Sequence, residues 1–201
     1  MFVLPLALLL SAGGPHPATI SAPRSSARTA PAAYAIDPAH SEVSFRIRHF
    51  VTKVRGRFND WSGTINGDPQ NWSNGSVEVV IKSASISTGN DRRDADLRSA
   101  RFFAVDSFPE ITFKSTKVES SGESITITGD LTMRGVSRPV VLKGSYLGSV
   151  PGKPGDKVGF DASTTINRTE YGIAWNRAVE GGGVMLGDDV EISISIEANR
   201  Q

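Results

Sequence analysis

Residues 42–49, EVSFRIRH, alternate strictly between apolar and polar side chains until the final histidine. Every second position carries one set of side chains, Val43, Phe45, Ile47 and His49, and only polar or charged side chains lie between them. Successive side chains of a β-strand point to opposite faces of its sheet, so this period of two predicts a strand with one dry and one wet face.

The same alternation recurs along the rest of the chain. We expect further strands at 54–65 (a broken one), 77–82, 111–114, 125–133, 140–146, 158–167 and 190–197. Turn-forming residues lie between several of these segments, at 120–123, 135–139 and 151–156. Such short connections join antiparallel neighbours.

About eight two-faced strands must bury their dry faces, in either a sandwich or a closed barrel. We favour an all-β fold, an eight-stranded antiparallel barrel. The interior of such a barrel has room for packed side chains or for one slim ligand. The same apolar face serves both arrangements, so the pattern alone leaves a filled core and a pocket as open alternatives.

A short helix is expected within residues 90–99, NDRRDADLRS. Asn90 or Asp91 can cap its start, and acidic residues fill its first turn. Arg93 and Asp94 could grip a head group, but we favour a role in anchoring the helix through ion pairs. We place the helix near one mouth of the barrel.

Residues 169–189 form the other irregular stretch. The segment is rich in glycine and carries Tyr171, Ile173 and Trp175. Long loops of this kind are often lids or binding loops, and we expect a lid here.

Charge and composition exclude several classes of function. The whole chain has a net charge of +1 and no cysteine. A near-neutral domain lacks the basic footprint that nucleic-acid binding needs. Without cysteine there can be no disulfide, thiolate metal site or cysteine nucleophile.

The N-terminal region differs from the rest of the chain. We expect a signal peptide over residues 1–12, a flexible spacer rich in proline, alanine and serine over 13–33, and the folded domain from 34 to 198. The apolar run at 2–10 is too short to span a bilayer, which needs about 20 residues. A misassigned start codon or an apolar tail is the alternative to export.

Several sequence motifs occur in order between residues 34 and 198. They are IDPAHS at 36–41 with the alternation that follows, Gly56-Arg57-Phe58, Gly63, RDADLRS at 93–99 with Phe102-Phe103 and Phe108-Pro109, GDLT at 129–132 with Gly135-Val136 and Pro139-Val140, Gly159-Phe160, Arg168, Tyr171-Gly172 and DVEI at 189–192. With these motifs the chain resembles the YceI-like family of lipocalin-like proteins associated with polyisoprenoid and other lipid binding.

The resemblance implies a lipocalin-like barrel with an apolar lipid threaded inside, a periplasmic or secreted location, and often a homodimer. It implies no cofactor, although an isoprenoid or fatty-acyl lipid would be the ligand. We expect neither a transmembrane segment nor a nucleic-acid partner. The predicted ligand-binding residues are Phe45, Ile47, His49, Phe58, Trp61, Val79, Ile81, Leu97, Phe102, Phe113, Met133, Leu142, Phe160, Tyr171 and Trp175.

The histidines allow few chemical roles. His49 ends a dry face, where it either donates to a lipid head group at the barrel mouth or bonds to a backbone or carboxylate partner. For His40, which precedes the strand, we favour a structural role. We predict no metal site, because the two histidines lack a clear third ligand and no HExxH or CxxC motif occurs.

The first functional hypothesis is therefore non-catalytic binding, transport or sequestration of a long apolar lipid. The second is an enzyme acting on a quinone-like or lipid-like substrate, in which His49 could pair with Asp94. The sequence contains no GxSxG nucleophile motif, no P-loop and no dinucleotide-binding motif, and we predict no catalytic residues. The third is a packed stress-response module, which predicts a filled barrel.

Overall fold

The barrel is built from eight strands that form a closed circuit of hydrogen-bonded neighbours. The computed structural model describes residues 31–201 except 154, 179 and 181. Among these residues the strands are β1 (Ala32–Ile36), β2 (Glu42–His49), β3 (Thr52–Phe58), β4 (Trp61–Asp68), β5 (Asn71–Lys82), β6 (Ile86–Ser87), β7 (Glu110–Ser121), β8 (Ser124–Met133), β9 (Val136–Val150), β10 (Lys157–Asn167) and β11 (Leu186–Arg200).

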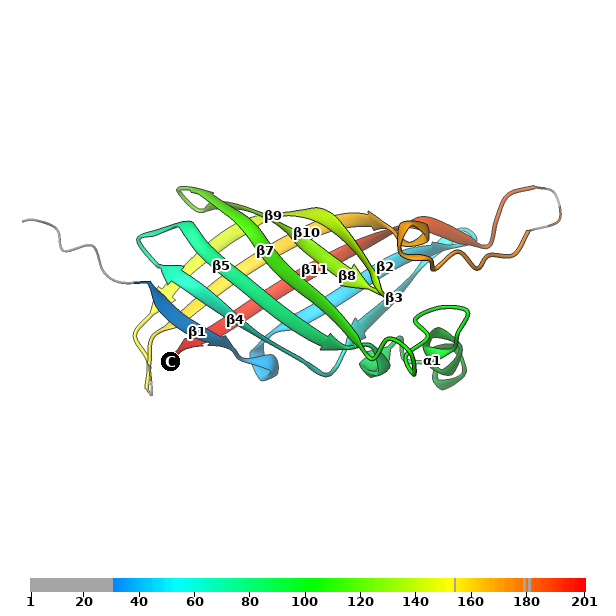
Figure 1. Ribbon diagram of the computed structural model, residues 1–201, viewed down its shortest axis with the longest axis horizontal. Coiled ribbons are helices and arrows are strands. Elements are labelled where there is room, and N and C mark those ends of the chain that lie inside the picture. The colour runs from blue at the N-terminus through cyan, green and yellow to red at the C-terminus, as the bar shows by residue number, and fades with distance from the viewer. Residues whose placement is uncertain (1–30, 154, 179, 181) are drawn as a thin grey trace, which may run out of the picture.

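The circuit runs β1-β4-β5-β7-β8-β9-β10-β11 and closes where β11 pairs with β1. Every pairing in it is antiparallel. The predicted eight-stranded antiparallel barrel is therefore confirmed. Figure 1 shows an elongated molecule with β1 and the C-terminus at one end of its long axis and the helix α1 (Asp91–Arg98) at the other.

β2 and β3 form a hairpin that extends the wall toward the helix end. β1 pairs with the last residues of β11, and β2 pairs with the preceding part of the same edge. A 3-10 helix, Pro38–His40, separates β1 from β2. The other edge of β3 pairs with β6 only at Arg57 and Phe58. The hairpin is thus joined to the barrel on one side and reaches beyond the closed circuit.

Several strands differ from the sequence pattern. The broken strand expected at 54–65 is two strands, β3 and β4, and β5 starts at Asn71 instead of at residue 77. No strand was expected before residue 42. β1 starts at Ala32, so the last two residues of the predicted spacer belong to the sheet, whereas residues 1–30 lie outside the described part of the chain. β9 starts at Val136 and includes Pro139, which we expected in a turn. β11 starts at Leu186, inside the predicted loop, and its register with β2 shifts before Val190. That shift breaks the alternation, which hides the strand's start.

The predicted helix is confirmed as α1. The Asn90 side chain caps it by accepting a hydrogen bond from the Arg93 amide. Asp94 is buried and accepts from both the amide and the hydroxyl of Thr88, at 2.8 and 2.5 Å. Arg93 donates to the Thr88 hydroxyl and carbonyl. Hydrogen bonds to Thr88, not the ion pairs that we expected, therefore anchor α1.

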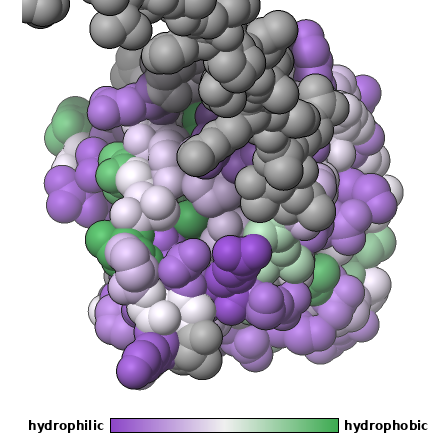
Figure 2. Space-filling model, turned by 90° about the vertical axis from the view of Figure 1, so that its left-hand side faces the viewer, coloured by the Kyte–Doolittle hydropathy of each residue, from purple (hydrophilic) through white to green (hydrophobic). Residues whose placement is uncertain are grey.

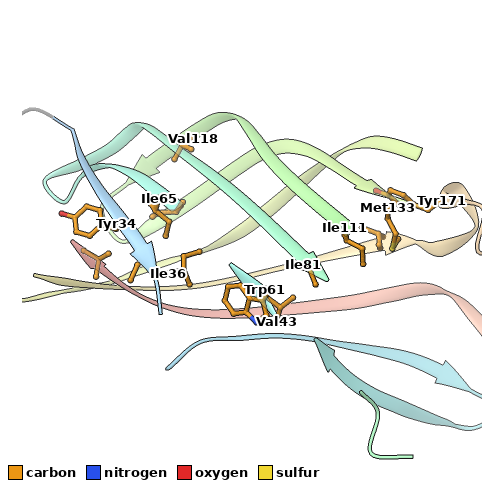
Figure 3. Close-up of a cluster of buried hydrophobic side chains, with 14 of the residues drawn as sticks. Tyr34, Ile36, Val43, Trp61, Ile65, Ile81, Ile111, Val118, Met133 and Tyr171 are labelled. Atoms are coloured by element: carbon orange, nitrogen blue, oxygen red, sulfur yellow. The ribbon is translucent and has the colours of Figure 1, made fainter. Parts of the chain in front are cut away.

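The strands pack closely where they cross. Gly144 on β9 lies so near β10 that a Cβ built on it would come 1.8 Å from the Asp161 carbonyl oxygen. Glycine alone permits this approach of two backbones. Figure 3 shows the buried side chains running along the interior, from Tyr34 at one end to Met133 and Tyr171 at the other.

Candidate functional site

The barrel encloses one long cavity with an apolar wall. Its volume is about 360 Å³, within the range of about 300–1,000 Å³ that is typical of small-molecule sites. The wall reaches from Val118 and Ile125 to Met133 and Trp175. Ile125 and Met133 are eight residues apart on β8, which corresponds to about 26 Å of strand at roughly 3.3 Å per residue. The cavity can therefore accept an extended molecule.

All but one of the predicted ligand-binding residues lie on this wall. They are Phe45, Ile47, His49, Phe58, Trp61, Val79, Ile81, Leu97, Phe102, Phe113, Met133, Leu142, Phe160 and Trp175. Tyr171 does not line the cavity; it is fully buried, and burial raises the pKa of its hydroxyl. The structure therefore places Tyr171 in the packed core and outside the cavity wall, not facing a ligand as we expected.

One end of the cavity is closed by aromatic rings, and we call it the aromatic end. Trp72 contacts Tyr34, Tyr146 and Phe160, with ring centroids 5.9, 5.5 and 4.9 Å away. Trp72 and Phe160 also belong to the cavity wall. Large tilted rings of this kind fill space efficiently, so they form the floor of the cavity.

The opposite end, which carries α1, reaches solvent. Arg93 lies on the cavity wall and is exposed, whereas the other wall residues are buried or half-buried. Trp175 packs against Phe102 at 5.3 Å, and the Arg101 guanidinium lies 5.1 Å above the Trp175 ring. Arg101 also forms an ion pair with Asp96. These contacts bring the predicted lid and the α1 region together over the mouth.

His49 lies on the cavity wall near this mouth. Its ring meets Phe50 edge-on, with centroids 4.7 Å apart. Among the described residues its imidazole has no hydrogen-bond partner, neither Asp94 nor a backbone group. The imidazole is therefore available to a ligand, and the His49–Asp94 pair that the enzyme hypothesis would use does not form.

Comparison with known proteins identifies the family. The YceI-like domain model matches residues 34–198, which are almost all of the barrel. The chain belongs to the YceI-like family.

Relatives and solved structures agree with this assignment. The UPF0312 protein SAB2563 of Staphylococcus aureus is 38% identical over 167 residues, which cover 82% of this chain and 95% of the relative. The Campylobacter jejuni YCEI protein is 33% identical with a TM-score of 0.68, covering 75% of this chain and 87% of that one.

Two more distant structures share the fold. Burkholderia cenocepacia BcnA has a TM-score of 0.70 at 22% identity, covering 81% of this chain and 98% of that one. A polyisoprenoid binding domain from Saccharophagus degradans has a TM-score of 0.63 at 16% identity, covering 85% and 99%.

Arg168 holds together the segment that we expected to act as a lid, and the sequence pattern does not reveal this role. Its buried guanidinium donates to the carbonyl oxygens of Ile173, Trp175 and Gly187 and to the carboxylate of Asp188. Burial lowers the pKa of Arg168, and Asp188 opposes that shift. Every residue has a backbone carbonyl group, so the sequence does not indicate which carbonyls Arg168 contacts, and only the fold reveals them.

His40 has the structural role that we favoured. Its Nδ1 lies 2.9 Å from an Asp37 carboxylate oxygen and 3.9 Å from Glu197. This hydrogen bond, with a second from the Ala39 amide, lowers the pKa of Asp37. Asp37, His40 and Glu197 are the one group of potential metal ligands in the described residues, and Lys157 already pairs with Glu197.

None of the helices in the described residues is long and apolar enough to cross a membrane.

Proposed function

We propose that this YceI-like protein binds a long apolar lipid non-catalytically inside its barrel, for transport or sequestration in the periplasm or outside the cell. The observation that carries the proposal is the continuous apolar cavity between the aromatic end and the helix end. A polyisoprenoid-like or acyl-like chain is the ligand class that matches a long, slim and apolar space.

Burial of the chain supplies the affinity. Each buried CH₂ contributes about 0.8 kcal/mol. About ten such groups would contribute about 8 kcal/mol, which is comparable to the estimated 4–15 kcal/mol cost of association. A longer tail leaves a surplus, so tight binding does not require a specific head group.

Two further observations support the proposal. The Saccharophagus degradans domain that shares this fold is described as polyisoprenoid binding, although at 16% identity the likeness extends to the fold alone. The apolar run of residues 2–10 followed by small residues is typical of a secretory signal, which supports export.

The alternatives receive less support. A packed stress-response module requires a filled interior, whereas the barrel holds a cavity of about 360 Å³. An enzyme acting on a quinone-like substrate would require an arranged acid–base pair, and His49 has no carboxylate partner among the described residues.

A blocked cavity tests the proposal. Ala162 lies on the wall midway along β10, and its neighbour Ser163 is exposed on the outer face. Ala162→Phe places a ring in the bore, and Ser163→Phe adds the same ring outside. Uptake of a fluorescent long-chain polyene fatty acid should fall strongly in Ala162→Phe and persist in Ser163→Phe. Equal uptake by both variants would contradict binding inside the barrel.

A further inference from the structure

The tip of hairpin β2–β3 is apolar and exposed. Phe50 and Val51 form its turn, and their relative exposures are 43% and 102%. Val184, exposed to 41%, lies beside them, because Arg48 donates hydrogen bonds to the carbonyl oxygens of both Phe50 and Val184. We call Phe50, Val51 and Val184 the apolar tip. Single exposed apolar side chains are common, whereas apolar side chains that lie together on the surface are typical of an interaction site.

The turn is also strained. Phe50 has a φ of 52°, in the left-handed region where glycine is strongly preferred. Two-residue hairpin turns normally carry glycine, asparagine or aspartate at such positions. A bulky ring held there lowers the stability of the fold, so its presence indicates a role outside folding.

Four basic residues surround the stem behind the tip. Arg46, Arg48, Lys53 and Arg55 are all exposed on the outer face of the hairpin, and we call them the basic collar. Arg46 lies directly opposite Arg55, and Arg48 lies directly opposite Lys53. Like charges in directly opposed positions destabilise a sheet.

The collar is only partly neutralised. Lys53 forms an ion pair with Glu191, and that contact lowers the pKa of Glu191. In the part of the chain that the structure describes, Arg46 and Arg55 have no carboxylate within ion-pairing distance. Arg46 lies directly opposite Glu191 on β11, and its charge adds to the lowering of the Glu191 pKa. Neither Arg46 nor Arg55 is held in a direct ion pair within the described residues, so both guanidinium groups can still contact an external anion.

Charge is distributed unevenly between the hairpin and the rest of the domain. Residues 42–58 contain five basic residues and one acidic residue. The remainder of residues 34–201 contains fifteen basic and twenty acidic residues. The hairpin is thus a positive element on a domain that is otherwise negative, which would orient the molecule near a negatively charged surface.

The inner face of the same hairpin belongs to the cavity. Ile47, His49 and Val54 line the wall, and Met185 lines it beside the tip. The Phe50 amide donates to the Met185 carbonyl, which ties the tip to this part of the mouth. An apolar molecule that enters or leaves past these residues would pass directly beside the apolar tip.

We propose that hairpin β2–β3 docks the helix end of the barrel onto an anionic lipid bilayer, with the apolar tip in the interface and the basic collar on the lipid phosphates. The spacing suits this arrangement. Arg48 and Arg46 lie two and four residues behind Phe50, or about 7 and 13 Å at roughly 3.3 Å per residue. Apolar faces of interfacial segments enter a bilayer by about 5–10 Å. With the apolar tip at that depth, the basic collar lies at the level of the lipid phosphates.

The aromatic end shares only the exposed apolar residues, Leu147 and Val150 on β9, and among the described residues it lacks the opposed pairs of basic residues. Where Figure 2 shows this end uncovered, its surface is predominantly hydrophilic with scattered hydrophobic residues. Leu147 on β9 is exposed there. It provides a matched control, because it is a large exposed apolar residue without a basic collar.

Flotation with vesicles tests the docking. Phosphatidylcholine vesicles are prepared with and without phosphatidylglycerol, and the full chain is compared with two variants of the hairpin. Arg46→Gln/Arg55→Gln removes two unpaired charges, and Phe50→Gly/Val51→Asn replaces the tip with residues that suit the turn. The second variant should unfold at the same temperature as wild type or higher, so a loss of binding would not reflect misfolding.

Wild type should float with the anionic vesicles only, and more weakly as salt is raised. At about 1 kcal/mol per basic residue, the charge variant should lose about 25-fold in partition coefficient. The tip variant should lose at least about tenfold, since burying one large apolar side chain contributes about 1.5–3 kcal/mol. Lys117→Gln/Lys143→Gln and Leu147→Ser, which lie outside the hairpin, should stay within about twofold of wild type.

Two outcomes would overturn the docking proposal. One is vesicle binding that the hairpin variants leave unchanged. The other is a smaller sedimentation coefficient of the hairpin variants than of wild type when no vesicles are present. That difference would show that the hairpin joins two copies of this chain. The docking proposal goes beyond lipid binding and can be tested separately from it. The hairpin variants should take up the polyene fatty acid from vesicle-free solution as wild type does. If the wild type takes up none, lipid binding inside the barrel is contradicted, but membrane docking is not.

Discussion

The ring of Phe45 covers the Cα of Gly56, its directly paired neighbour across β2 and β3. A Cβ on Gly56 would lie 2.3 Å from Phe45 Cζ. The ring also contacts Phe58, with centroids 5.9 Å apart. Because Gly56 has no side chain, the Phe45 ring can lie flat against the wall and leave the bore of the cavity open.

Gly56→Ala should therefore destabilise the barrel and narrow its bore. The added methyl group must displace the Phe45 ring, and such overpacking typically costs about 1–3 kcal/mol. Chemical denaturation measures the loss, and polyene fatty-acid uptake should fall with it. Gly159→Ala is the control, because a Cβ there meets its nearest atom, Leu147 Cβ, at 3.4 Å. Equal stability of the two variants would count against the packing of Phe45 on Gly56.

Arg168→Met should release the lid while leaving the barrel closed. Three backbone carbonyl groups would lose their buried donor, and each such loss costs about 1–3 kcal/mol. Amide hydrogen exchange should rise in residues 172–178 and 186–188 and stay slow in β7 and β8. Arg168→Lys should resemble Arg168→Met, since an ammonium group cannot reproduce the planar fork of donors. Unchanged exchange in the lid would contradict this role.

Asp94→Ala should loosen α1. Its carboxylate accepts two hydrogen bonds from Thr88 in a buried position, and loss of charge-assisted bonds costs about 1.5–3 kcal/mol. Asp91→Ala removes the same charge from the exposed first turn and should cost only about 0.3–1 kcal/mol. Hydrogen exchange within α1 distinguishes the two variants, and equal protection in both would show that Thr88 does not anchor the helix.

His40→Ala should raise the pKa of Asp37 toward its ordinary value, since the His40 hydrogen bond is the largest cause of its lowering. NMR titration of the Asp37 carboxyl group measures the shift. A carboxyl whose pKa is lower in the folded state stabilises the fold above its unfolded pKa of about 3.9, and that contribution is lost as pH falls through the folded pKa. The part of the difference in unfolding free energy between wild type and variant that comes from Asp37 should therefore vanish in strong acid. An unchanged Asp37 pKa in the variant would refute the assignment.

Local pattern was sufficient to predict most of the wall. The alternation of Val43 through His49 places those side chains on one face wherever the strand lies, and the structure puts that face on the cavity. The helix was equally readable, because Asn90 is a capping residue followed by acids in the first turn. Both features depend on residues close together in the chain.

What the sequence could not show depends on contacts between distant segments. The alternation did not reveal that the interior holds a cavity, because the space left inside depends on how β1 closes on β11. β1 itself was missed, since Ala32 and Ala33 are small and follow a proline-rich stretch. The opposition of Arg46 and Arg55 likewise required the register of the hairpin.

The most direct test of lipid binding is mass spectrometry of the organic extract from full-length protein purified, without detergent, from its own host. The wild type should release a long-chain isoprenoid or acyl lipid in an amount close to that of the protein. The Ala162→Phe variant should release far less, and Ser163→Phe should match the wild type. A wild-type extract without lipid, from protein that also takes up no apolar probe, would contradict the central claim.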